Sequence, residues 1–162
     1  MTTDPNRAFL RHVVATLAYR CAKALRGAPA EFAQFEAGET TRTPVEILAH
    51  MGDLLDWVLA LAREGHVYRE SAPLPWDEEQ VRFHRALGAL DDFLAGDAPL
   101  ATPAEKLFQG GLADALTHTG QLAMLRRMQG APMKGESYAR ADIVAGRVGP
   151  EQTPAEAKYE FD

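Results

Sequence analysis

Apolar residues recur at intervals of three and four in several stretches of the chain, and no stretch alternates between apolar and polar residues as a β-strand does. The stretches span about residues 7–25, 44–64, 77–94 and 103–129. This periodicity is typical of helices that bury one side against their neighbours. The sequence therefore predicts an all-α fold, a four-helix bundle.

Local signals at the helix ends agree with this periodicity. The segments Thr43-Pro44-Val45-Glu46 and Thr102-Pro103-Ala104-Glu105 each combine a threonine N-cap, a proline at the first helical position and a glutamate that completes a capping box. Gly65 and Gly130 follow the expected ends of two helices, where glycine is favoured. The long connection over residues 26–43 permits an up-up-down-down helix order, which we expect in place of a simple up-down order.

The length of 162 residues fits one domain, so we expect a single helical domain over 1–162 with its core at about 7–130. Residues 131–162 are rich in glycine, proline and charge, and they show no long amphipathic pattern. They also include aromatic and aliphatic residues, which makes them too apolar for simple disorder. We predict an irregular C-terminal tail packed on the bundle or on a partner subunit.

Composition excludes several classes of protein. The net charge of −6 argues against nucleic acid and against an anionic membrane as partners. The single cysteine, Cys21, rules out an internal disulfide framework and suits a reducing compartment. No apolar run approaches the roughly 18 residues of a membrane span, and the start of the sequence lacks the apolar region of a signal peptide. We expect a cytoplasmic protein, and the wide apolar arcs of its helices predict a homodimer.

The residues that indicate chemistry lie in the last helix. Asp114 and His118 are four residues apart, so their side chains lie on the same helical face, within a largely apolar stripe. Burying such groups without partners costs about 2–7 kcal/mol each. His50, in an apolar row of the second helix, is the best candidate for a third group. Together His50, Asp114 and His118 predict a site for a divalent transition metal, with zinc or nickel expected, and three protein ligands leave positions open for a substrate.

A simpler interpretation remains beside this one. Asp114 and His118 could form a polar pair within one helix, with His50 only hydrogen-bonded. Asp53 and Asp56 could support His50, although a solvated surface is the simpler role for both. Gln121, one turn from His118, could hydrogen-bond a ligand or a helix terminus, although a structural polar contact is the simpler role. Two glycines of the last helix, Gly111 and Gly120, predict places where another helix approaches closely.

The segment Glu46-Ile-Leu-Ala-His50-Met-Gly-Asp-Leu-Leu-Asp-Trp57 and the later segment DALTHTGQLAMLRRMQGAP resemble the DinB/YfiT-like family of metalloenzymes over about residues 8–132. The resemblance implies a four-helix bundle that holds a divalent metal through a histidine of the second helix and an HxxxH pair of the fourth. It includes the family's HxGQL segment, here His118-Thr-Gly-Gln-Leu122. Asp114 stands where the family has the first histidine of the pair. The resemblance also implies thiol-dependent chemistry with a low-molecular-weight thiol.

Two functions are therefore open. The first is a metal-dependent enzyme, a thiol-dependent transferase or a hydrolase, that acts on a small-molecule substrate. In this case the tail near Tyr138, Arg140 and Arg147 would cover the opening of the site. The second is a non-catalytic helical bundle that binds a small ligand or acts as a dimeric interaction module.

Overall fold

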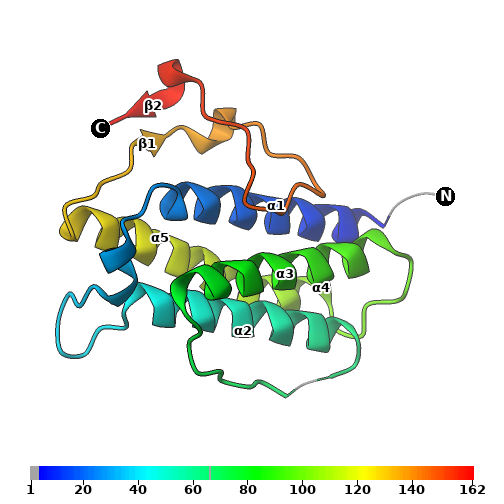
Figure 1. The fold of residues 1–162 in the computed structure, drawn as a ribbon. Coiled ribbons are helices and arrows are strands. Elements are labelled where there is room, and N and C mark those ends of the chain that lie inside the picture. The colour runs from blue at the N-terminus through cyan, green and yellow to red at the C-terminus, as the bar shows by residue number, and fades with distance from the viewer. Residues whose placement is uncertain (1–3, 66) are drawn as a thin grey trace.

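A computed structural model describes residues 4–65 and 67–162 and shows the expected all-α, four-helix arrangement (Figure 1). Residues 1–3, at the start of the expected domain, and His66, in the expected connection after the second helix, lie outside the described residues. The first three long helices are α1 (Pro5–Leu25), α2 (Pro44–Ala62) and α3 (Trp76–Ala95). The fourth long helix consists of three consecutive pieces: α4 (Ala104–Leu107), the π-helix η2 (Phe108–Leu112) and α5 (Ala113–Met128). The short elements are the 3₁₀ helices η1 (Ala30–Gln34), η3 (Tyr138–Arg140) and η4 (Ala157–Tyr159) and the strands β1 (Gly135–Glu136) and β2 (Glu160–Phe161).

The start of α2 confirms the predicted capping signal. The Glu46 carboxylate accepts hydrogen bonds from the backbone nitrogen of Thr43 at 2.7 Å and from its hydroxyl at 3.0 Å. Pro44 occupies the first helical position, where its missing N–H costs no hydrogen bond. This cap fixes the point at which α2 begins and hence the place of His50 along it.

The first and last helices run in the same direction. The rings of Phe9 and Phe108, near the start of each, lie 6.2 Å apart. Near the end of each, Arg126 Nη1 donates to the carbonyl oxygen of Ala24 at 2.8 Å. The two helices are therefore parallel, as Figure 1 also shows.

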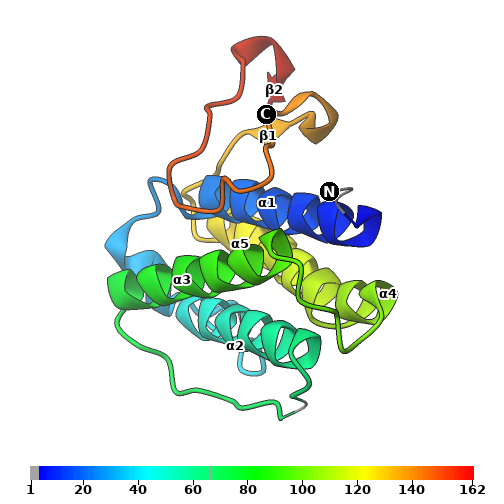
Figure 2. The ribbon, with the colours of Figure 1, turned by 90° about the vertical axis from the view of Figure 1, so that its right-hand side faces the viewer.

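The two middle helices run the opposite way, which corrects the expected up-up-down-down order. Arg11, early in α1, pairs with Asp91, late in α3, at 2.9 Å, so α1 and α3 are antiparallel. In Figures 1 and 2, α2 and α3 run side by side in one direction. The order is up-down-down-up. Because α2 and α3 are parallel, the connection between them has to return along the length of the bundle. This connection, described over residues 63–65 and 67–75, makes the crossover.

The core lies where the four helices meet. Its largest buried side chains come from all of them and from η1: Leu10, Leu17, Phe32, Leu48, Met51, Leu55, Phe83, Leu87, Leu90, Leu94, Leu107 and Leu112. Cys21 is fully buried among them. Within residues 4–65 and 67–162, none of the helices combines the length and the apolar character that a membrane span requires.

The tail packs along α1 and contains a small sheet, which the sequence did not predict. Strands β1 and β2 pair antiparallel, with Gly135 opposite Phe161. The buried carboxylate of Glu136 accepts hydrogen bonds from the Tyr19 hydroxyl and from Lys23 Nζ, both at 2.7 Å. These strands are only two residues long, too short to show an alternating pattern. Figures 1 and 2 place the tail on the side of α1 that faces away from α2.

The last helix is interrupted, where the sequence predicted a continuous one. Its π-helix contains Gly110 with φ −85° and ψ −112°, a backbone conformation outside the helical region. A π-helical hydrogen bond closes a loop one residue longer than an α-helical one, i→i+5 in place of i→i+4, and one residue corresponds to about 100° of rotation along an α-helix. Side chains after residue 112 are therefore rotated relative to those before it, so a helical wheel drawn through the whole segment misplaces Asp114 and His118.

α2 and the last helix approach each other closely at Gly111. A Cβ atom built there would lie 2.5 Å from Val58 Cγ2 and 3.1 Å from the carbonyl oxygen of Leu54. The predicted close approach is confirmed at Gly111. It is wrong at Gly120, where nothing lies within 4 Å of such an atom. Only a residue without a side chain at 111 allows the two helices to lie this close.

The two glycines form a matched pair for a stability measurement. We expect Gly111→Ala to lower the free energy of unfolding by about 1–3 kcal/mol, because the new methyl group overpacks the contact with α2. We expect Gly120→Ala to raise it by about 0.5–1 kcal/mol, because alanine is the better helix former and the site has room. Urea denaturation followed by circular dichroism measures both, and equal midpoints for the two variants would contradict the close contact.

Candidate metal centre

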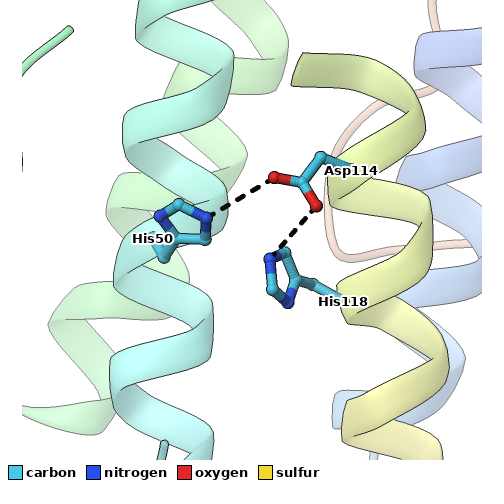
Figure 3. Close-up of side chains that lie close together, drawn as sticks. All are labelled: His50, Asp114 and His118. Carbon is cyan, nitrogen blue, oxygen red and sulfur yellow. Dashed lines mark ion pairs between the residues drawn. The ribbon is translucent and has the colours of Figure 1, made fainter. Parts of the chain in front are cut away.

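The structure brings the predicted residues His50, Asp114 and His118 together between α2 and α5 (Figure 3). His50 Nε2 lies 3.6 Å from Asp114 Oδ2, and His118 Nε2 lies 3.4 Å from Asp114 Oδ1. The two imidazole ring centres are 4.8 Å apart. The carboxylate thus lies to one side of the two rings, with one oxygen toward each (Figure 3).

These separations fit a single metal ion. Zinc binds histidine nitrogen and carboxylate oxygen at about 2.0–2.2 Å, so two ligand atoms at a tetrahedral angle are about 3.3 Å apart. The nitrogen–oxygen distances are close to this value. One ligand atom from each residue lies within 4.8 Å of the others, so side-chain rotations that bring these atoms closer together would complete a coordination shell around one ion.

One side of the cluster faces solvent. The His50 and His118 side chains are 16% and 12% exposed, whereas that of Asp114 is 47% exposed. The sequence placed Asp114 in the core-facing stripe of the helix, and this was wrong because the π-helix rotates it to the edge. The buried row of α5 instead contains Ala115 and Thr119. The exposed carboxylate leaves room for a ligand from solution.

The ring of His118 is held by a residue of its own helix. Gln121 Oε1 lies 2.7 Å from His118 Nδ1. An amide oxygen accepts a hydrogen bond, so Nδ1 carries the proton and the lone pair of Nε2 faces Asp114. Gln121 therefore fixes the ring orientation and tautomer that metal binding requires.

The ring of His50 is held by Tyr68, which the sequence analysis did not single out. The Tyr68 hydroxyl lies 2.8 Å from His50 Nδ1. The tyrosine ring packs edge-on against Trp57, with 5.9 Å between ring centres. Tyr68 belongs to the part 67–75 of the crossover, and no spacing in the sequence relates it to His50. Only the parallel arrangement of α2 and α3, which draws this segment back along α2, brings it there.

Acidic residues of α2 and α3 hold the same segment. Asp53 Oδ2 accepts from the backbone nitrogen of Ser71 at 2.8 Å, and Glu79 Oε2 accepts from that of Leu74 at 2.9 Å. Arg82 forms ion pairs with both carboxylates. Asp53 is only 3% exposed, so the interpretation of Asp53 as solvated surface was wrong. Its role is to anchor the segment that carries Tyr68.

Burial is the main cause of a lowered pKa at His50. The positive charge of Arg42 and the neighbouring His118 lower the pKa of His50 further, and the Asp114 carboxylate opposes them. The neutral imidazole is the form that binds metals. The surroundings of His50 therefore favour that form.

The tail does not lie where the first hypothesis placed it. The Tyr138 ring packs edge-on against Tyr19 and stacks with the guanidinium of Arg20, both on α1. Arg147 pairs with Asp142 within the tail at 3.0 Å. These contacts hold the tail on α1, and the segment beside the candidate site is the one that carries Tyr68.

Comparison with known proteins gives no relative: no protein-family model, no curated protein and no solved structure matches the chain.

The lowered pKa of His50 gives a pH-dependent prediction. In the metal-free protein we expect the ring protons of His50 to titrate in NMR spectra with a midpoint below the ordinary value of 6.5. The unfolded chain then binds more protons than the folded one near this pH. The contribution of His50 to the free energy of unfolding is therefore fully present above pH 6.5 and is lost as the pH falls through the folded-state pKa. A midpoint at or above 6.5 would contradict this description of the site.

Proposed function

We propose that the protein is a divalent-metal-dependent enzyme of the DinB-like kind, in which His50, Asp114 and His118 hold the ion. The observation that supports this most directly is the convergence of the three donors, from two helices, at separations that suit one ion. The resemblance of the same segments to the family supports it independently. The aspartate in place of the family's histidine supplies a carboxylate oxygen, which is a common zinc ligand.

Three protein ligands and a solvent-facing side are the arrangement of a catalytic metal site, because positions remain for a substrate. A bound divalent ion lowers the pKa of a coordinated water or thiol and so supplies a nucleophile near neutral pH. In this chain, Gln121 and Tyr68 orient the two imidazoles, and Asp114 lies toward the open side. The proposed reaction class is a thiol-dependent transfer or a hydrolysis on a small molecule. The thiol, the homodimer and the cytoplasmic location stay predictions.

Metal binding is the first test. We expect zinc or nickel to bind the purified protein at one ion per chain, measured by calorimetry and by elemental analysis after dialysis. His118→Ala and Asp114→Asn should each weaken binding by more than about 100-fold, beyond what the loss of an outer hydrogen-bond partner usually costs. His12→Ala, a histidine of α1, is the matched control and should bind as the unmodified protein does. Absence of stoichiometric binding under every loading condition would favour the non-catalytic bundle, with Asp114 and the two histidines as a polar network.

The hydrogen bonds to the two Nδ1 atoms give a graded prediction. Gln121→Leu and Tyr68→Phe each remove one partner and keep the ligands, so we expect each to lower zinc affinity by about 10–100-fold. Gln109→Leu, an exposed glutamine in the π-helix, is the control. Zinc affinities equal to that of the control would show that these contacts do not orient the rings.

A further inference from the structure

A cavity of about 520 Å³ adjoins the candidate metal centre. His118 and Gln121 are among its lining residues, so the cavity and the cluster share a wall. The rest of the wall comes from the connection before α2, from the first turn of α2 and from the last turns of α5. The volume lies within the usual range of small-molecule sites, about 300–1,000 Å³.

Two larger cavities, of about 660 Å³ each, are less suited to serve the cluster. One follows α3 and is lined by Arg82 and Arg85, and the other lies between the end of α1 and the start of α3, beside His84. None of His50, Asp114 and His118 lines either of them. The cavity at His118 is therefore the one from which a bound molecule reaches the proposed ion.

Apolar side chains from two helices line this cavity. Ile47 of α2 contributes one side, and Met124, Leu125 and Met128 of α5 contribute the other. Met124 is 63% exposed and Met128 is 55% exposed, although both are large apolar side chains. They lie one turn apart on the same face of α5. Methionine adapts its shape readily, so this surface suits the apolar body of a small molecule.

Of the described residues that line the cavity, Arg42 is the only arginine or lysine, and no aspartate or glutamate is among them. Its guanidinium pairs with Glu70 at the long distance of 3.9 Å, and both side chains are well exposed, at 46% and 74%. Such a pair contributes little and is readily exchanged. The guanidinium has the fork geometry that binds a carboxylate through two parallel hydrogen bonds.

We propose that this cavity binds a small organic carboxylate with an apolar body. Arg42 binds the carboxylate, the methionine side of the cavity covers the apolar part, and the molecule lies beside His118. The proposal names a substrate class for the proposed metal-dependent enzyme, and in that respect it rests on the proposed function. Binding to the cavity itself requires only the residues described above.

Octanoate and octanol are matched probes, because they share the apolar chain and differ in the charged group. Calorimetry gives the affinity, and chemical shifts of backbone amides locate the site on the full chain. We expect octanoate to bind at least about tenfold more tightly than octanol and to shift the amides of residues 37–47 and 118–128, since hydrogen bonds to a charged group are among the stronger ones.

Two arginine variants isolate the charge. Arg42→Gln should weaken octanoate binding about tenfold and leave octanol binding unchanged, whereas Arg85→Gln, which changes an exposed arginine of a different cavity, should alter neither. Met128→Ser should weaken both probes, because it removes apolar surface that they share. Circular dichroism on each variant checks that the helical fold is retained.

The outcomes separate this proposal from the proposed function. Octanoate binding that depends on Arg42 supports the cavity whether or not zinc binds. Equal affinities for octanoate and octanol, equal octanoate affinities of Arg42→Gln and the unmodified protein, shifts that map elsewhere, or no saturable octanoate binding would each overturn it. Arg42→Gln should still bind zinc at one ion per chain, because Arg42 supplies no ligand and its positive charge opposes a cation at His50. Loss of zinc binding through His118→Ala alone concerns only the metal centre.

Discussion

The contact between α2 and the last helix at Gly111 is the constraint on which the candidate site depends. There the backbone of the last helix lies against Leu54 and Val58 with no room for a side chain. His50 is one turn before Leu54 on α2, and Asp114 is about one turn after Gly111 on the antiparallel partner. The donors can meet because the helices are already held close at the neighbouring turn. The same few residues therefore determine both the packing of this helix pair and the geometry of the cluster.

The π-helix adds a rotation to this approach. With a continuous α-helix, Asp114 would follow the buried row of Leu107 into the core. The extra residue in η2 turns Asp114 to the edge, where its carboxylate is half exposed and His118 remains mostly buried. A buried carboxylate would have to be fully paired inside the protein, whereas one at the edge keeps contact with solvent. The π-helix therefore places the Asp114 carboxylate in the solvent-facing part of the site and not in the core.

Much of this arrangement follows from the sequence. Helical periodicity, the Thr43 cap and the four-residue spacing of Asp114 and His118 predicted the elements and the cluster, because these are local properties of a helix. The helix order, the π-helix and the Tyr68 contact were not predicted. They depend on how segments far apart in the sequence pack, and the parallel pairing of α2 and α3 decides all contacts of the crossover. Asp53 shows the same limit: its place on the helix resembles solvated surface, yet Arg82 and the backbone of Ser71 enclose it.

The most direct test of the account is X-ray absorption spectroscopy of the zinc-loaded, full-length protein. The proposed metal centre predicts nitrogen and oxygen ligands at about 2.0–2.1 Å, with the outer scattering of two imidazole rings. In the His118→Ala variant the contribution of one ring should disappear. A zinc shell without imidazole scattering, or one that is unchanged by His118→Ala, would contradict a metal centre built from His50, Asp114 and His118.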